Sequence, residues 1–135
     1  MPTTRNSVTI RAPVDTVWKV VGSLESVVRW VPGVTTCRLE GAIRICNGGE
    51  SQEEISGYSV ERRSYCFRHL RIPLPVVSSA GSFTVAGNGE TTVTLEWSFE
   101  AADPSQEAAV GQMVDGAAKQ TPARLRGLVE GQGNV

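Results

Sequence analysis

The chain has 135 residues, of which 40% are hydrophobic, and its 13 Lys and Arg nearly balance its 14 Asp and Glu, for a formal net charge of −1. This length allows one hydrophobic core, so residues 1–135 are expected to form a single domain, which excludes a multidomain enzyme. A near-neutral chain without a cluster of basic residues is not expected to bind nucleic acid or an anionic membrane surface.

The first part of the chain predicts one strand followed by two short helices. Apolar residues alternate over residues 3–11, which is typical of a half-buried strand. Apolar residues then recur at helical spacing over residues 14–22 and again over residues 23–31. Pro32 and Gly33 end the second helix.

The middle of the chain predicts six consecutive strands. The apolar pattern changes to a period of two, with turn residues about every 8 to 12 positions. Asn-Gly-Gly-Glu at 47–50 and Gly-Asn-Gly-Glu at 87–90 are predicted hairpin turns, because Gly and Asn tolerate positive φ. The strands are expected near residues 34–40, 42–47, 50–57, 62–71, 78–87 and 91–101.

The last part of the chain predicts one long helix that opens at residues 103–105, where a proline suits the first helical turn. Its apolar face is made by Val110, Met113, Val114, Ala117, Ala118, Leu125 and Leu128. Pro122 lies inside this pattern and removes one backbone hydrogen bond, so a kink or an end is expected near Thr121.

This order of elements predicts an α+β fold. A seven-stranded antiparallel sheet has one apolar face to bury, and the long C-terminal helix is the only element able to cover it. The sheet is therefore expected to curve around that helix, and the two short helices can close one end. Such a wrap commonly leaves space, so an internal hydrophobic cavity is expected.

No segment resembles a signal peptide or a membrane span, so a cytoplasmic protein without membrane insertion is expected. The three cysteines, Cys37, Cys46 and Cys66, form no CxxC pair and accompany a single histidine. A metal site is therefore not predicted. Their odd number also argues against a closed disulfide framework, and small buried thiols are expected instead.

Short segments spread over nearly the whole chain point together to a known family. They are VTIRAPVDTVW at 8–18, WVPG at 30–33, GAIR at 41–44, SQEEI at 51–55, RSY at 63–65, LPV at 74–76 and VTLEWSF at 93–99. In this order they resemble the polyketide cyclase/dehydrase and lipid-transport family of the START-like (SRPBCC, birch-pollen-allergen-like) helix-grip superfamily. That superfamily includes cyclases, dehydratases, hormone receptors and lipid carriers, so the resemblance implies a fold more strongly than a function.

Two charged residues are predicted to face each other across the first hairpin. If residues 48–49 form a two-residue turn, Arg44 lies opposite Glu53 with their Cβ atoms about 5 Å apart. The alternation does not decide which face of the sheet they occupy, because Ile43 and Ile45 take the opposite phase. An exposed cross-strand ion pair, with a contribution below about 1 kcal/mol, is one possibility.

The resemblance implies the other possibility. The pattern at 51–55 followed by an arginine pair at 62–63 is similar to plant abscisic-acid receptors. In those receptors the corresponding arginine and glutamate face the cavity and meet the ligand through water, which implies an inward Arg44 and Glu53. The same parity implies three more inward residues: Cys46, Ser51 and Ile55.

His69 is the only histidine and the natural candidate for acid–base chemistry near neutral pH without a metal. It shares a strand face with Tyr65 and Phe67, and this aromatic face is expected to point inward. A surface histidine or a structural, hydrogen-bonded histidine is the alternative.

Further ligand contacts are expected from the remaining strands, the long helix and the loops, with Trp30, Leu74, Val76 and Met113 at the rim of the cavity. Each of these residues is otherwise an ordinary core residue. The expected ligand-binding residues are Trp30, Cys46, Ile55, Phe67, Leu74, Val76, Ser79, Gly81, Phe83, Leu95, Trp97, Val110, Met113 and Val114.

The favoured function is an enzyme that binds a small hydrophobic, polyketide-like molecule and catalyses its cyclisation, dehydration or aromatisation in secondary metabolism. Arg44 would stabilise an enolate, His69 or Tyr65 would exchange a proton, and Glu53 would orient Arg44 or a water, with no cofactor required. A noncatalytic carrier or sensor of a hydrophobic ligand or lipid is the alternative, and an interaction domain with a filled core is the third. A monomer and a homodimer are both compatible with the sequence.

Overall fold

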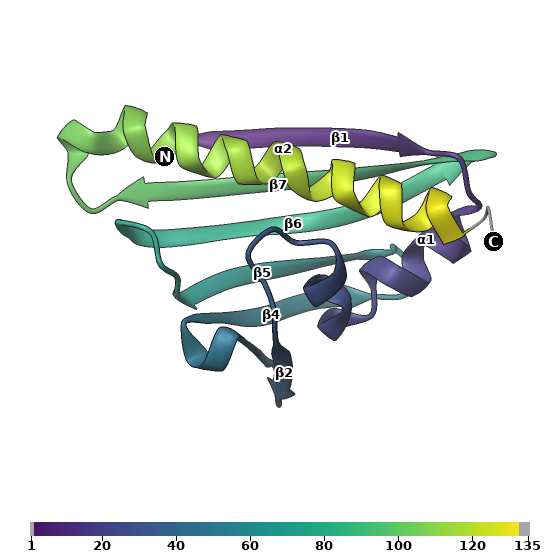
Figure 1. Cartoon of the computed structure of the whole chain (residues 1–135), viewed down its shortest axis with the longest axis horizontal. Coiled ribbons are helices and arrows are strands. Elements are labelled where there is room, and N and C mark those ends of the chain that lie inside the picture. Colours follow the sequence, from purple (N-terminus) through teal and green to yellow (C-terminus); the bar gives the residue numbers. More distant parts are fainter. Residues whose placement is uncertain (1, 133–135) are drawn as a thin grey trace.

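One antiparallel sheet and one long helix make up most of the computed structural model, which describes residues 2–132 (Figure 1). The strands are β1 (Thr3–Ile10), β2 (Cys37–Glu40), β3 (Ile43–Cys46), β4 (Ser51–Ser59), β5 (Ser64–Arg71), β6 (Val76–Asn88) and β7 (Glu90–Ala101). The α-helices are α1 (Val14–Val21) and α2 (Glu107–Gln132), and the 3-10 helices are η1 (Leu24–Arg29), η2 (Asn47–Gly49) and η3 (Pro104–Gln106). The predicted order of elements is confirmed.

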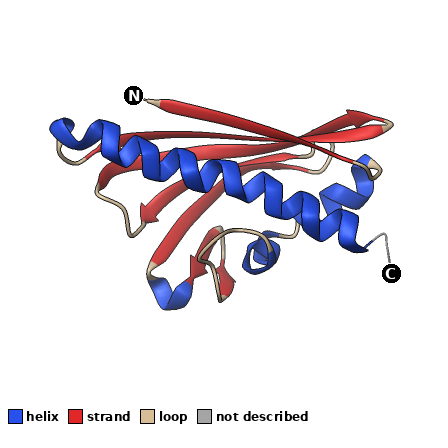
Figure 2. Cartoon of the chain, turned by 45° about the horizontal axis from the view of Figure 1, so that its top comes forward, coloured by secondary structure: helices blue, strands red, loops and turns tan. Residues whose placement is uncertain are grey.

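The first strand pairs with the last. The sheet order is β1-β7-β6-β5-β4-β3-β2, so β2 to β7 follow one another as antiparallel neighbours and β1 lies beside β7. Helix α2 runs along one face of this sheet and packs against β1 and β7 (Figures 1 and 2). In Figure 1 the segment with α1 and η1 lies in front of the strands, on the same face of the sheet as α2 and beside the C-terminal half of that helix.

The core forms where the inner face of the sheet meets α2. Val93, Leu95, Trp97 and Phe99 on β7 are buried, as their alternation predicts, and Glu96 and Glu100 are exposed. Burial of each large apolar side chain stabilises the fold by about 1.5–3 kcal/mol. The helix contributes its own row of buried residues: Val110, Val114, Ala118, Leu125 and Val129.

Of the two expected outcomes near Thr121, a kink or an end, the end does not occur, because helix α2 continues through Pro122. Proline cannot donate to the carbonyl of Ala118, a loss of about 3 kcal/mol or more in a helix interior. Thr121 Oγ1 donates to the carbonyl of Ala117 at 2.8 Å, and both Ala118 and Leu125 are fully buried on either side of the proline. Packing of this face against the sheet therefore keeps the helix whole.

The close approach of three strands explains one glycine in β6. A Cβ atom on Gly81 would lie 2.2 Å from the carbonyl oxygen of Glu96 and 2.6 Å from Cζ of Phe67. Gly81 was an expected ligand contact, but the ring of Phe67 covers it, and Gly81 is not part of the cavity wall.

We therefore expect Gly81→Ala to lower the free energy of unfolding by about 1–3 kcal/mol, because strand backbone has to shift. Gly116 in α2 is the matched control, because a Cβ there meets no atom within 4 Å. Gly116→Ala should raise the stability by up to about 1 kcal/mol. Urea unfolding of both variants measures the difference, and equal stability of Gly81→Ala and the wild type would contradict the packing described here.

Candidate functional site

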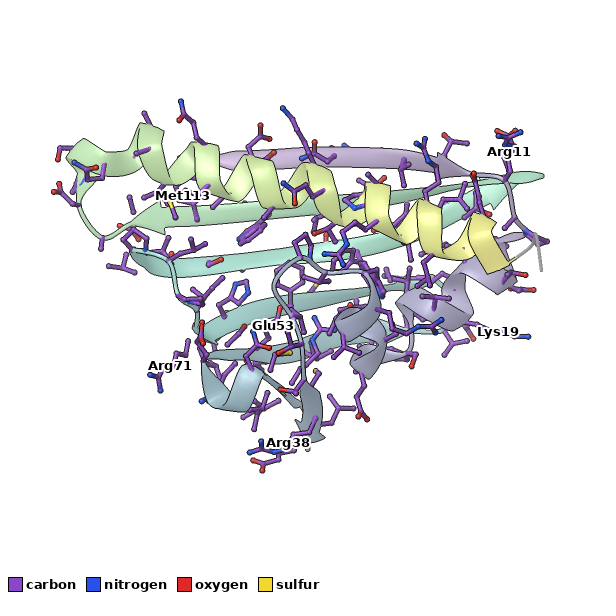
Figure 3. All side chains as sticks on the ribbon, in the orientation of Figure 1. Arg11, Lys19, Arg38, Glu53, Arg71 and Met113 are labelled. Carbon is purple, nitrogen blue, oxygen red and sulfur yellow. The ribbon has the colours of Figure 1, made fainter. Side chains whose placement is uncertain are left out.

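A cavity of about 70 Å³ lies between the inner face of the sheet and the segment that follows α1. Its wall combines the middle strands with η1, the loop after η1 and one residue of α2. Figure 3 shows Glu53 in this region, behind that loop. The lining residues are Val27, Val31, Val34, Arg44, Glu53, Phe67, His69, Phe83, Leu95, Trp97 and Thr121.

The cavity is smaller than a typical ligand pocket, which holds roughly 300–1,000 Å³. Aromatic rings pack against one another beside the cavity. The ring of Trp30 meets Phe83 edge to face with 5.2 Å between centroids, and Tyr65 lies 5.5 Å from Phe83. The cavity as it stands accommodates a small polar group and a few carbon atoms.

The Arg44–Glu53 pair is the polar centre of the site. The two residues are directly opposed in the β3–β4 register, as predicted, with η2 as the connecting turn. Arg44 is 2% exposed and Glu53 9%, so the alternative of an exposed pair is wrong. Arg44 Nε donates to Glu53 Oε1 at 2.9 Å.

Arg44 also ties the short helix η1 to the sheet. Its Nη1 donates to the carbonyl of Leu24 at 3.0 Å and to the hydroxyl of Tyr65 at 3.1 Å. Burial alone lowers the pKa of Arg44, but Tyr65 and Glu53 outweigh it and raise that pKa, so the guanidinium stays charged.

The remaining nitrogen of Arg44 is available to a ligand. Within the described chain, Nη2 makes no hydrogen bond to another residue, and every fully buried polar side-chain atom of those residues has a partner. Nη2 is therefore not fully buried, and Arg44 is part of the cavity wall. An oxygen atom in the cavity has charged N–H donors within reach.

His69 belongs to a hydrogen-bond chain that sets its tautomer. Trp97 Nε1, which can only donate, donates to Ser79 Oγ at 2.6 Å. The Ser79 hydroxyl is thus free to donate to Nδ1 of His69, 2.8 Å away, while Nε2 of His69 lies 3.4 Å from Glu53 Oε2. An ionised Glu53 favours a proton on Nε2, so Nδ1 carries the lone pair.

The imidazole is held neutral. Burial is the largest effect that lowers the pKa of His69, and nearby Arg44 lowers it further. Glu53 and a hydrogen bond with the Ser79 backbone raise that pKa and only partly offset these effects. Its side chain is 8% exposed. The site therefore combines a charged donor, Arg44, with an uncharged base, His69.

The gap between β5 and β6 makes His69 reachable from a second side. The two strands pair from Ser64 with Thr84 to Arg68 with Ala80, and no described pair follows. A hollow of about 160 Å³ opens beyond that point and is lined by His69, Leu70, Arg71, Ile72, Val76 and Ser79. His69 is the residue that this hollow shares with the inner cavity.

Four of the expected ligand-binding residues form cavity wall: Phe67, Phe83, Leu95 and Trp97. Tyr65, the other residue expected to exchange a proton, points inward and is fully buried, and its hydroxyl accepts a hydrogen bond from Arg44. It is not among the residues that line the cavity, and burial raises its pKa. Ser79 contacts His69 and the hollow between β5 and β6.

Other expected contacts lie elsewhere. Trp30, expected at the rim, is fully buried and donates from Nε1 to Ser26 Oγ, whereas Met113 is 51% exposed and lies toward the start of α2 (Figure 3). Leu74 packs against the core, and Val76 lines the second hollow. Buried core positions outside the cavity wall are Cys46, Ile55, Val110 and Val114.

The wall of the cavity opposite the sheet is formed by residues that were not predicted as ligand contacts. Val27, Val31 and Val34 come from η1 and the loop after it, and Thr121 comes from α2. Thr121 is a polar residue on the apolar face of a helix, beside a proline, and this position was the sequence feature that could have identified it as part of the site. Among residues 2–132 no three His, Cys, Asp or Glu side chains are placed to hold a metal ion.

The curved sheet, the long covering helix and the inner cavity define a helix-grip fold. Residues 1–130 match the family model described as polyketide cyclase / dehydrase and lipid transport, and the chain belongs to this family. Neither α-helix of the described chain has the length and apolar character needed to cross a membrane.

Solved structures share this fold at low sequence identity. The protein XoxI from Bacillus cereus superposes with a TM-score of 0.85 at 20% identity, over 98% of this chain and 99% of that one. The di-domain ARO/CYC BexL from the BE-7585A biosynthetic pathway gives 0.84 at 20% identity, over 100% of this chain and 48% of its own. The Zhui aromatase/cyclase from Streptomyces sp. R1128 gives 0.64 at 15% identity, over 98% and 93% of the two chains. None of the curated proteins matches this sequence.

Because His69 is the only histidine, its titration can be followed without ambiguity. Its pKa in the folded protein is lowered below 6.5, so the unfolded chain takes up a proton first as the pH falls. His69 therefore contributes stability above its unfolded pKa that is lost progressively at lower pH. NMR titration should show a midpoint below pH 6.5, and His69→Gln should remove this part of the pH dependence of urea unfolding between pH 7.5 and 5. A midpoint above 6.5 would contradict the neutral tautomer.

Proposed function

We propose that the protein is a cofactor-independent enzyme that binds the carbonyl end of a small hydrophobic, polyketide-like molecule and catalyses its cyclisation, dehydration or aromatisation. The observation that carries this proposal is the juxtaposition of Arg44 Nη2 and neutral His69 in one apolar cavity. A reaction through an enolate needs a charged donor for the oxygen and a base for the α-proton. Membership of a polyketide cyclase/dehydrase family supports the same chemistry.

The proposed reaction uses this chain's own residues at each step. The ketone oxygen accepts from Arg44 Nη2, and the guanidinium stabilises the negative charge that develops on it. The Ser79 hydroxyl turns away from Nδ1 of His69, which then takes the α-proton. Glu53 stabilises the resulting imidazolium through Nε2, and in a dehydration His69 returns the proton to the departing hydroxyl, which leaves as water.

The rest of a polyketide-like molecule requires more room than about 70 Å³. Val31 and Val34 form the part of the wall that belongs to a loop, and loops move more readily than strands within a sheet. We expect the longer part of the ligand to enter under this loop, with its reacting carbonyl toward Arg44.

A carrier or sensor of a hydrophobic ligand is the second candidate. Both ring nitrogens of His69 already have protein partners, and the wall is otherwise mostly apolar. In this function Arg44 and Glu53 only hold the polar end of the ligand. Catalytic turnover separates the two functions.

The test of catalysis is His69→Gln assayed with 2,4,6-heptanetrione, a short poly-β-ketone. Loss of the general base should slow formation of the cyclised product about 100-fold or more, with binding of the trione retained. Arg68→Gln is the matched control on the next position of β5, because Arg68 is exposed and pairs with Glu54 on the outer face. Chromatography of the product gives the rate, and an unchanged rate in His69→Gln with intact binding would favour the carrier function.

Binding at Arg44 needs a variant that still folds. Arg44→Met alone leaves Glu53 buried without its partner and should cost about 3–5 kcal/mol of stability. The double variant Arg44→Met with Glu53→Leu removes both charges and should recover most of that loss. It should nevertheless bind the trione at least about 10-fold more weakly in calorimetry, because a charged hydrogen bond is lost. Wild-type affinity in the double variant would reject Arg44 as the ligand's anchor.

A further inference from the structure

Two cysteines meet at the edge of the sheet where β2 joins β3. Cys37 and Cys46 are directly opposed in the strand register, and Cys46 Sγ donates to Cys37 Sγ at 3.0 Å. The two are free thiols in contact, since a disulfide bond measures about 2.05 Å.

The backbone here already suits a disulfide. The amide of Asn47 donates to the carbonyl of Thr36 at 3.0 Å, so the adjacent pair, Cys37 and Cys46, is a non-hydrogen-bonded pair. Such pairs have Cα atoms about 4.5 Å apart, within the range of roughly 4.4–6.8 Å that disulfides span. The sulfur atoms can therefore bond through side-chain rotation, with the strands in place.

The two thiols differ in access. A surface hollow of about 130 Å³ is lined by Cys37 together with Thr36, Arg38, Ile45 and Gly48. Cys37 is half-buried, whereas Cys46 is 1% exposed and its burial raises its pKa to about 12. A reagent in solution thus meets Cys37 first, and Cys46 is placed to react second.

The cysteine pair also lies at the end of the segment that covers the inner cavity. We call residues 31–36 the strap; it carries Val31 and Val34 of the cavity wall and leads directly into Cys37. In Figure 1 this segment passes in front of the sheet and runs down to β2.

Asn47, next to Cys46, holds the same end of the strap through its side chain. Its Oδ1 accepts from the amide of Thr35 at 2.8 Å, and its Nδ2 donates to the carbonyl of Gly33 at 2.8 Å. A covalent bond one residue away reinforces these hydrogen bonds.

We propose that Cys37 and Cys46 form a reversible dithiol–disulfide pair that reacts with small disulfides such as oxidised glutathione and, when oxidised, fastens the strap over the cavity. The Cys37 thiolate attacks the reagent's S–S bond, forms a mixed disulfide and releases one thiol. The Cys46 thiolate then attacks the Cys37 sulfur and releases the second thiol. The protein loses two electrons and two protons, the reagent is reduced to two thiols, and excess reduced thiol reverses the reaction.

The first experiment uses the full chain with Cys66→Ser, which removes the exposed third thiol. After incubation with oxidised glutathione, mass spectrometry with thiol alkylation should show two blocked thiols and no retained glutathione. Adding Cys46→Ser should leave one glutathione on Cys37, and adding Cys37→Ser should leave buried Cys46 unreacted. A stable glutathione adduct on the Cys66→Ser protein would overturn the proposal. So would a Cys66→Ser protein in which both thiols can still be alkylated, under conditions in which the variant with Cys46→Ser takes up glutathione.

The second experiment measures the strap without any ligand, so its result does not depend on the proposed enzyme. Oxidation should slow hydrogen exchange of the Thr35 and Thr36 amides at least about 10-fold and raise Tm by roughly 5–10 °C. Asn47→Ala should speed that exchange in the reduced protein, with less effect once the disulfide has formed. If the disulfide forms and exchange in residues 31–36 is unchanged, the fastening of the strap is rejected.

Discussion

The burial of one ion pair imposes order on the site. Taking Arg44 and Glu53 out of water costs several kcal/mol for each ion, and their mutual attraction and further hydrogen bonds offset that cost. Arg44 bonds through Nε and Nη1 to residues of η1, β4 and β5. The same bonds fix the plane of the guanidinium, so its one free edge has a defined direction. The direction of Nη2 thus determines where the oxygen atom of a ligand can accept a hydrogen bond from Arg44.

This charge also determines the state of its neighbours. A second positive charge beside Arg44 is unfavourable in a poorly hydrated interior, which helps to keep His69 neutral. Trp97 completes the arrangement from the other side, because its indole can only donate and so directs the Ser79 proton toward the imidazole. Donors therefore converge on Glu53 from both sides, from Trp97 through Ser79 and His69 and from Arg44 on β3. A single positive charge, that of Arg44, is presented to the cavity.

The local features that sequence predicts well here are those with short-range causes. A glycine pair between two strands was enough to place Arg44 opposite Glu53, and the aromatic face of β5 placed His69 inward. The inward face of Arg44 needed the family resemblance, because Ile45 on the other phase is buried as well. How side chains pack together does not follow from an apolar pattern: Trp30 is fully buried against Phe83 instead of lying at the rim of the cavity. Pro122 shows the reverse case, in which packing of a whole helix face overrides a local rule.

The separation of β5 from β6 after Arg68 and Ala80 affects how fast protons can reach the site relative to a ligand. Water can approach His69 and Ser79 from this fork, while the loop bearing Val31 and Val34 stands over the opposite side. Protons can thus equilibrate with bulk solvent while the cavity remains covered. In the proposed reaction, recovery of the neutral imidazole and exchange of the ligand would be governed by different parts of the fold, so one step can be fast while the other is slow.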